Sequence, residues 1–296
     1  SNLTFGGSYS GVFIPSGITN LRNLTINNTN GVAINSNITL ASGGTLTLAS
    51  GILNAGANII SITNTSSSAI SYTPGSFVNV TTGGLQRTLP SSLSGAGNNY
   101  LFPIGETNVY KGLNLIDVNT GATGPVMRAS VSAAGALTGD NSTIGPVDPR
   151  YWSLINTNGG NLTSARVELF ETGLNEYKTI GTSTSVSGNY VSIGGSLNPS
   201  SITSSVLTGF STYYCIGMIW IDTYYSYQTG NWNAFTTWTS DPSGTLQTGT
   251  TVPGNGDRVI ILSDRTVSLT SDVTASDLDL TIESGGVLDQ AAFRFT

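Results

Sequence analysis

The sequence predicts an all-β protein in which parallel β-solenoid (β-helix) segments alternate with a β-sandwich, as a rod of tandem repeats. The first observation is that two pairs of apolar residues, each with the form apolar-x-apolar, recur 22 residues later. The repeated pairs are Leu24 with Ile26 and Ile38 with Leu40, followed by Leu46 with Leu48 and Ile60 with Ile62. The second is that Gly, Asn, Ser and Thr separate the pairs, as tight corners between strands require. The third is the lack of helical periodicity longer than one or two turns.

Residues 1–97 are predicted to be the C-terminal part of a β-solenoid module. Apolar residues at positions i and i+2 lie on one face of a strand, so each repeated pair would point inward. One rung of a solenoid cannot bury its inner face alone, so the 22-residue period implies a stack of rungs. The pattern ends near Gly83-Gly84 and the Gly- and Ser-rich segment that follows.

Residues 98–220 are predicted to form a β-sandwich domain, because apolar runs continue there without a repeat. Between Ala165 and Leu169, apolar and charged residues alternate, as in a half-buried antiparallel strand. About seven such strands separated by Gly and Pro favour a sandwich. We interpret Trp152 and Trp220 as packing residues, and the single cysteine, Cys215, as a small buried hydrophobic residue.

Residues 221–296 are predicted to start the next β-solenoid module. Leu280-Thr281-Ile282 repeats Leu24-Thr25-Ile26. With one residue of slip, Val287, Phe293 and Phe295 align with the inward residues Val32, Ile38 and Leu40. We therefore expect the 296 residues to be a piece of a longer protein, and neighbouring modules of the same chain to be its first partners.

The composition excludes several classes of function. Only 9% of the residues are charged, and the net charge of −6 argues against nucleic acid, which binds basic surfaces. No run of 18 apolar residues occurs, so no membrane span is predicted. The chain has no histidine, which removes Ser-His-Asp and Cys-His catalysis and His-liganded zinc. We therefore predict a protein that is not an enzyme and needs no cofactor, although paired carboxylates, as in glycosidases, stay open as an alternative.

Two tryptophans could form a binding site. Trp232 and Trp238 are six residues apart, so on one strand they would share a face. They could then stack against a glycan. The other interpretation, which we favour, is a cap of bulky rings over the first rung of the solenoid.

Aspartates gather in the last forty residues and are candidate Ca²⁺ ligands, because calcium takes six to eight oxygen ligands. The candidates are Asp257, Asp264, Asp272, Asp277 and Asp279. Their spacing matches neither an EF-hand nor a nonapeptide calcium repeat, so a solvated face is the favoured interpretation.

Several short motifs carry a resemblance to known proteins. Gly230-Asn231-Trp232, then Trp238, the turn Pro253–Asp257 and the run Leu278–Leu288 resemble modules of very large surface proteins of Bacteroidota. The segments Tyr100–Gly105 and Asp148–Trp152 resemble the sandwich that follows such modules.

Proteins of this class resemble substrates of the type IX secretion system, among them gliding-motility adhesins of the SprB kind. The resemblance implies a structural or adhesive module at the cell surface, exported across the outer membrane. It also implies partners in the type IX secretion and gliding machinery, and an external surface or polysaccharide as the target. The alternatives are a carbohydrate-active β-helix enzyme and a carbohydrate-binding module.

Overall fold

The chain forms two compact units, residues 1–218 and 219–296, and each is described by itself. The structure is a computed structural model that describes residues 1–140, 143–145, 147–175, 178–219, 222–254, 256–275 and 278–294. Strand makes up 48% of the residues and helix 2%, which confirms the predicted all-β class. In the described part of the chain, no helix is long and apolar enough to cross a membrane.

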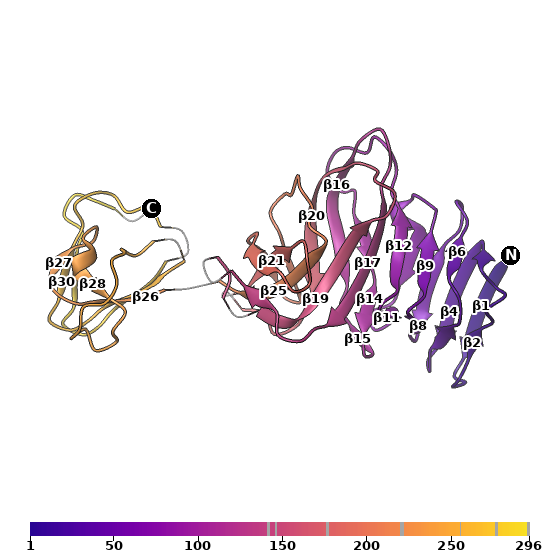
Figure 1. Ribbon diagram of the computed structural model, residues 1–296, viewed down its shortest axis with the longest axis horizontal. Helices are drawn as coiled ribbons and strands as arrows, with labels where there is room; N and C mark the ends of the chain where they lie inside the picture. The colour runs from indigo at the N-terminus through magenta and orange to yellow at the C-terminus, as the bar shows by residue number, and fades with distance from the viewer. Residues whose placement is uncertain are drawn as a thin grey trace. The chain divides into compact units, whose positions relative to one another are not determined.

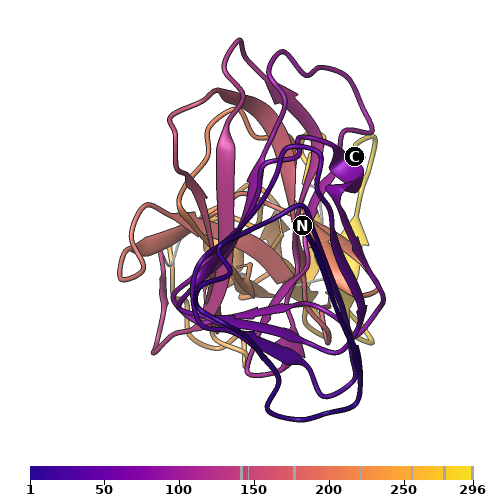
Figure 2. The same ribbon diagram turned by 90° about the vertical axis from the view of Figure 1, so that its right-hand side faces the viewer.

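The first unit begins with a parallel β-solenoid built from three sheets, whose strands Figure 1 shows stacked from β1 onward. One sheet contains β1 (Asn2–Gly7), β4 (Asn23–Asn28), β7 (Leu46–Ser50) and β10 (Ile70–Tyr72), the last preceded by the 3-10 helix η1 (Ser67–Ala69). The second contains β2 (Phe13–Ile14), β5 (Val32–Ile34), β8 (Leu53–Gly56), β11 (Val78–Val80), β14 (Ile104–Glu106) and β15 (Val109–Tyr110). The third starts with β3 (Asn20–Leu21), β6 (Ile38–Leu40), β9 (Ile59–Ile62) and β12 (Gly84–Thr88). In the end-on view of Figure 2, successive turns of the chain overlie one another.

The predicted register of the solenoid is confirmed. Leu24 lies beside Leu46 and Ile38 beside Ile60 in parallel pairs. All eight residues of the repeated pairs are 0–1% exposed. Leu85 on β12 continues the column beside Ile60. The sequence period therefore equals one turn of the coil, and each inward side chain rests on its counterpart in the next turn.

Uncharged polar residues line the outer face of these strands. Thr4, Thr25 and Thr47 follow one another in register. Where these strands begin, the Nδ2 of Asn23 donates to the Oδ1 of Asn2 at 3.0 Å, and the backbone N–H of Thr45 donates to the Oδ1 of Asn23 at 3.0 Å. Hydroxyl and amide side chains can stack in this way without the repulsion that like charges would cause.

The rest of the first unit is mainly antiparallel. The third solenoid sheet continues with β17 (Val126–Ala133), β19 (Val147–Asn156), β25 (Tyr213–Met218), β21 (Lys178–Ser183), β22 (Asn189–Ser192) and β18 (Thr138–Gly139). A separate sheet contains β13 (Tyr100–Phe102), β16 (Leu113–Thr120), β20 (Leu162–Phe170), β24 (Ser201–Thr203) and β23 (Ser196–Asn198). Buried residues of both sheets, such as Leu115, Val167 and Leu154, belong to the same hydrophobic cluster as the solenoid core. The assignment to a β-sandwich fold stays a prediction, as do the domain boundaries.

Strand β12 joins the two parts of this unit. It pairs parallel with β9 on one side and antiparallel with β17 on the other. One sheet therefore runs from the solenoid into the antiparallel region. The predicted alternation in β20 is confirmed, because Ala165, Val167 and Leu169 are buried while the charged residues between them are partly exposed. Trp152 and Cys215 are buried as predicted, and Trp220 lies outside the described residues.

The second unit is also a parallel stack. One sheet has the order β28 (Trp238–Thr239), β26 (Thr223–Ser226), β29 (Arg258–Ile261) and β31 (Asp279–Ile282). The other has the order β27 (Gly230–Asn231), β30 (Thr266–Ser268) and β32 (Val287–Asp289), and the 3-10 helix η2 (Phe235–Thr237) precedes β28. Strands β26, β29 and β31 are parallel to one another, as are β27, β30 and β32.

The predicted alignment of Val287 with Val32 is wrong. Leu288 lies beside the buried Val267, whereas Val287 is 47% exposed on the outer face. Six positions separate Ile26 from Val32, and six separate Ile282 from Leu288, so this corner needs no slip. Phe293 packs against the core of the unit as predicted, and Phe295 lies outside the described residues.

Candidate functional site in the second unit

The two tryptophans of the second unit form a buried pair. Trp232 follows β27 and Trp238 begins β28, and each is 1% exposed. Their ring centroids lie 5.0 Å apart at an interplanar angle of 75°, and the Nε1 of Trp238 donates to the backbone oxygen of Trp232 at 2.7 Å. Tyr224 adds an edge contact to Trp238, with the centroids 6.5 Å apart. Burial leaves no indole face open to a glycan.

The argument that the two tryptophans share the face of one strand is wrong, because η2 lies between them. What brings them together is the reversal of the chain: β28 pairs antiparallel with β26, on the side of β26 opposite β29. The pair thus lies beside the first strand of the stack, as a cap would. The cap interpretation is compatible with this geometry and stays a prediction.

The structure does not gather the calcium candidates that it describes into one cluster, although the N–H of Asp279 donates to the backbone oxygen of Asp257 at 3.0 Å. Among the described residues, no group of three or more Asp, Glu, His or Cys side chains could hold a metal ion. Asp277 lies outside the described residues, and Asp264 is exposed at a turn with φ +59°.

The three other candidates have local roles. The Oδ2 of Asp257 accepts the N–H of Gly254 at 2.7 Å, and burial raises the pKa of this carboxyl. The Oδ1 of Asp272 accepts the N–H of Arg294 at 3.0 Å, and Asp279 forms an ion pair with Arg258 at 3.4 Å. These carboxylates connect turns and neighbouring rungs. Calcium binding stays a prediction.

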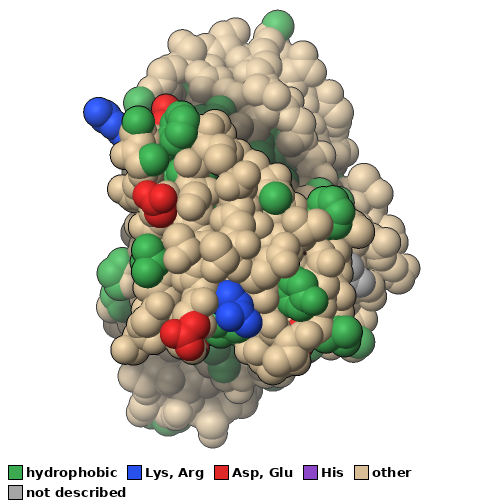
Figure 3. Space-filling view, turned by 90° about the vertical axis from the view of Figure 1, so that its left-hand side faces the viewer, with side chains coloured by type: hydrophobic (Ala, Val, Ile, Leu, Met, Phe, Trp, Pro, Cys, Tyr) green, Lys and Arg blue, Asp and Glu red, His purple; other side chains and the backbone are tan. Residues whose placement is uncertain are grey.

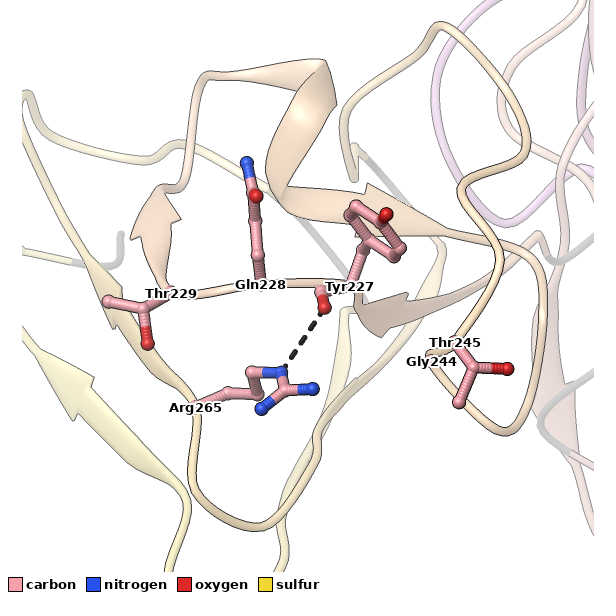
Figure 4. Close-up of a pocket in the computed structure, with 6 residues that line it drawn as sticks. All are labelled: Tyr227, Gln228, Thr229, Gly244, Thr245 and Arg265. Atoms are coloured by element: carbon pink, nitrogen blue, oxygen red, sulfur yellow. Dashed lines mark hydrogen bonds between the residues drawn. The ribbon is translucent and has the colours of Figure 1, made fainter.

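An open polar pocket of about 400 Å³ lies on the second unit. It is lined by Tyr227, Gln228, Thr229, Gly244, Thr245 and Arg265, which Figure 4 shows as sticks. Figure 4 shows the Arg265 guanidinium between the segment Tyr227–Thr229 and the loop that carries Gly244 and Thr245. The Nε of Arg265 donates to the backbone oxygen of Tyr227 at 3.2 Å, which orients the planar group.

One aspartate holds the loop that forms the far wall of this pocket. The Oγ of Ser243 donates to Asp241 at 2.6 Å, and the backbone N–H groups of Ser243, Thr245 and Leu246 donate to it at 2.9–3.1 Å. These hydrogen bonds hold the pKa of Asp241 well below its usual range, and the largest contribution comes from the Ser243 hydroxyl. The wall is therefore ordered by a carboxylate that is already fully engaged.

The lining of the pocket offers hydrogen-bond donors and an aromatic ring, but no carboxylate. Guanidinium, amide and hydroxyl groups recognise carboxylates and sugar hydroxyls. Among the lining residues, Tyr227 is the one of a type that can act as a general acid or base. The cationic and hydroxyl groups of the lining suit the binding of a polar or acidic ligand.

A second group of charged side chains lies in the first unit, where β14 meets β19 and β20. Arg150 bridges two carboxylates: its Nε lies 2.6 Å from the Oε1 of Glu106, and its Nη1 lies 3.2 Å from the Oε2 of Glu171. Lys111 forms an ion pair with Glu171, and Glu106 also accepts the backbone N–H of Ala133. The side chains of Lys111, Glu106 and Glu171 are 7%, 7% and 13% exposed. Each carboxylate therefore already has at least one cationic partner.

Sequence reasoning missed this ion-pair network and the buried Arg87. A signal for Arg87 was present, because the alternation Leu85-x-Arg87-x-Leu89 places its side chain on the inward face of β12. No comparable signal existed for the network, since its members come from four separate segments.

The two parallel stacks place this chain in the class of β-solenoid proteins. Comparison with protein-family models, with curated proteins and with solved structures finds no match to it.

Proposed function

We propose that this chain is a non-enzymatic structural and adhesive module of a giant extracellular adhesin of a bacterial surface. The observation that carries the proposal is the parallel stack, which occurs in the first unit and again in the second, with inward side chains in register. Such a stack is a stiff spacer, because every turn is bonded to its neighbours along the axis. A module of this kind sets the reach of a surface protein.

The polar but weakly charged surface suits a structural module of a surface protein. Figure 3 shows one face on which a few charged side chains and scattered hydrophobic ones lie among uncharged polar and backbone atoms. Only 9% of the residues are charged. The sequence resemblance to type IX secreted adhesins supplies the rest of the proposal: export to the cell surface, action in gliding and attachment, and a surface or polysaccharide as the target.

Three described side chains of types that can act in catalysis are already paired or buried, which supports a non-enzymatic role. The two glutamates of the ion-pair network are bound by Arg150 and Lys111. Cys215 is 0% exposed, and burial raises the pKa of its thiol, so the reactive thiolate is disfavoured. A polysaccharide lyase or hydrolase, the enzymatic alternative, needs acidic and basic groups that face an open groove.

Deletion of the coding region for this chain from the host gene, in frame, tests the proposal. We expect weaker attachment to glass and slower spreading on agar, with both restored when the region is returned. The control strain carries Glu106→Gln, Glu171→Gln, Lys111→Met and Arg150→Met at the chromosomal locus, which removes two negative and two positive charges together, and circular dichroism of the purified variant verifies its fold. It should behave as wild type if no catalysis is involved. Unchanged attachment in the deletion strain, with cleavage of a polysaccharide by the purified chain, would favour the enzyme.

The Arg265 pocket supports carbohydrate binding as a second candidate function. Titration calorimetry with oligogalacturonate and with a neutral galactan fragment tests it. Binding of the acidic oligomer that is lost in Arg265→Gln but kept in Arg294→Gln, whose native side chain is exposed in the same unit, would support a carbohydrate-binding module. Equal heats of binding for the wild type and both variants, with both sugars, would contradict this candidate function.

A further inference from the structure

Lys111 and Glu171 form an enclosed ion pair between two sheets of the first unit. Lys111 follows β15 and Glu171 follows β20. The Nζ of Lys111 contacts the Oε1 of Glu171, and the two side chains are only 7% and 13% exposed. The residues are 60 positions apart in the chain. Because β15 belongs to a solenoid sheet and β20 to the separate antiparallel sheet, this contact links the two parts of the unit.

The backbone fixes both members of the pair in place. The backbone oxygen of Lys111 accepts the Nε1 of Trp152 at 2.8 Å. The N–H of Phe170, the residue before Glu171, donates to the oxygen of Gly112, the residue after Lys111, at 3.0 Å. The amine and the carboxyl group are thus held together by ordered main chain on both sides. Two groups held in contact in this way react as if each were present at a very high concentration.

Aromatic side chains border the pair. Tyr110 and Phe170, the residues before Lys111 and Glu171, pack edge to face with their ring centroids 5.5 Å apart, and Trp152 is 1% exposed. Charged groups lose hydration in such surroundings, so transfer of a proton from the ammonium to the carboxylate costs less free energy than in water. The transfer produces a free amine and a carboxylic acid. A lysine amine freed of its proton is a nucleophile.

Hydrogen-bond donors also contact both oxygens of Glu171. The N–H of Thr172 donates to the Oε1 at 2.9 Å, and the Nη1 of Arg150 lies 3.2 Å from the Oε2. Donors in these positions stabilise the oxyanion that forms when a nucleophile adds to the carboxyl carbon. Glu106, with its Oε1 2.6 Å from the Nε of Arg150, is a positioning residue for the guanidinium. The guanidinium also favours the ionised carboxylate, so we expect the addition to be slow.

We propose that Lys111 and Glu171 condense to an amide, which cross-links the solenoid to the antiparallel part of the first unit. The ammonium first gives one proton to the carboxylate. The Nζ then forms a bond to the Cδ of Glu171, the bond from Cδ to the protonated oxygen breaks, and a second proton of the Nζ leaves with that oxygen as water. One positive and one negative charge disappear, and the reaction needs no oxidant. Each chain reacts once, without turnover, so the inference goes beyond the proposed function and does not depend on it.

The chain contains its own comparison pair. Its other lysine, Lys178, forms an ion pair with Asp148 at 2.8 Å. The side chains of Lys178 and Asp148 are 16% and 38% exposed, against 7% and 13% in the first pair. Water therefore reaches this carboxylate and keeps both groups ionised. We expect no amide between Lys178 and Asp148.

Intact-protein mass spectrometry of the purified chain tests the proposal. The mass should be lower than the sequence mass by that of one water molecule, and the fraction of such chains should rise over several days at room temperature. Lys111→Arg should have the full sequence mass at every time, because a guanidinium keeps the ion pair but is not a nucleophilic amine. Lys178→Arg is the matched control and should lose water as the wild type does. Circular dichroism verifies that both variants keep the native fold.

Digestion with trypsin locates the bond. Trypsin cannot cleave after a lysine whose amine is in an amide, so residues 88–128 should appear as one peptide, joined to residues 167–178. In Lys178→Arg the same joined peptides should appear. A disulfide cannot produce them, because Cys215 is the single cysteine.

A wild-type chain that keeps its full sequence mass throughout would overturn the proposal and leave Lys111 and Glu171 as an ion pair only. Loss of water that persists in Lys111→Arg would also overturn it, since the water then comes from another reaction, such as formation of a succinimide at an aspartate. Loss of water that disappears in Lys178→Arg would place the bond at the wrong lysine. These measurements use purified protein, so their outcome is independent of the attachment assays that test the proposed function.

Discussion

Arg87 is the residue at which the solenoid ends. Its side chain is 1% exposed and donates to three backbone oxygens, of Leu101 at 2.8 Å and of Ser66 and Ser67 at 2.9 Å. The guanidinium also lies 5.1 Å from the centre of the Tyr100 ring. Burial lowers the pKa of Arg87 to about 10, against the opposing effect of Tyr100, so the group is cationic at neutral pH. It supplies these carbonyls with a charged donor at the end of the coil, and the Ser66 oxygen also accepts the N–H of Ala69 at 3.1 Å.

Replacement of Arg87 by Met should lower the free energy of unfolding of the first unit by about 3 kcal/mol, because buried carbonyls lose charged donors. Arg87→Lys should lie between Met and wild type, since an ammonium cannot reach all three oxygens from one position. Urea titration followed by far-UV circular dichroism measures both. Arg22→Met is the control, because Arg22 is exposed, and it should shift stability by less than about 0.5 kcal/mol. Similar effects at both positions would contradict this role.

Asp241 should make the stability of the second unit depend on pH. Its hydrogen bonds lower the pKa of the folded carboxyl below its ordinary value of about 4. The stabilising contribution is therefore complete above that pH and is lost as the pH falls through the folded pKa.

Asp241→Asn should thus unfold at a lower urea concentration than wild type at pH 7, and the two midpoints should converge as the pH falls below about 4. Tryptophan fluorescence, measured in chains that also carry Trp152→Phe and Trp220→Phe so that only Trp232 and Trp238 remain, reports this unit. A gap between the midpoints that stays constant from pH 7 to pH 2 would show that the charge of Asp241 is not what orders the loop.

At the scale of the element, the corner between two rungs depends on one glycine. A Cβ on Gly44 would lie 1.8 Å from the backbone oxygen of Arg22 in the preceding rung. At Gly43, the residue before it, a Cβ would meet nothing within 4 Å. The two positions therefore differ in how closely the preceding rung approaches.

Gly44→Ala should therefore destabilise the first unit by about 2 kcal/mol or more, because the rungs must separate to admit the methyl group. Gly43→Ala should change stability by less than about 1 kcal/mol, in either direction. Thermal unfolding followed by circular dichroism compares them. If the two variants melt alike, close rung contact at this corner does not limit stability.

At the scale of the whole molecule, the two units have separate cores. The large hydrophobic cluster is built from residues of the first unit only, and the cluster around Trp232 and Trp238 from residues of the second only. Separate cores unfold as separate cooperative units, so a single free energy of unfolding does not describe the chain.

Differential scanning calorimetry should show two transitions. Gly44→Ala should move only the transition of the first unit, and Trp238→Phe, which removes the hydrogen bond to Trp232, should move only that of the second. One transition that both variants shift equally would show that the units unfold together.

The sequence alone determined the solenoid register, for a physical reason. Neighbouring rungs are one period apart in the chain, so Leu24 and Leu46, or Ile38 and Ile60, meet at a fixed separation that the repeat itself displays. The same logic predicted the parallel restart at Leu280-Thr281-Ile282. Alternation likewise predicted the half-buried strand around Val167, because a strand has only two faces.

Contacts between residues that no sequence repeat relates were decided by the tertiary structure alone. Leu115 meets Val167 across an antiparallel pair, and Arg150 meets Glu106 and Glu171, from segments whose separation follows no repeat. The burial of Trp232 against Trp238 was likewise hidden, because it depends on η2 and on the reversal of β28. A periodic pattern encodes contacts between equivalent positions, whereas these contacts join non-equivalent ones, and only the packing of the folded chain selects them.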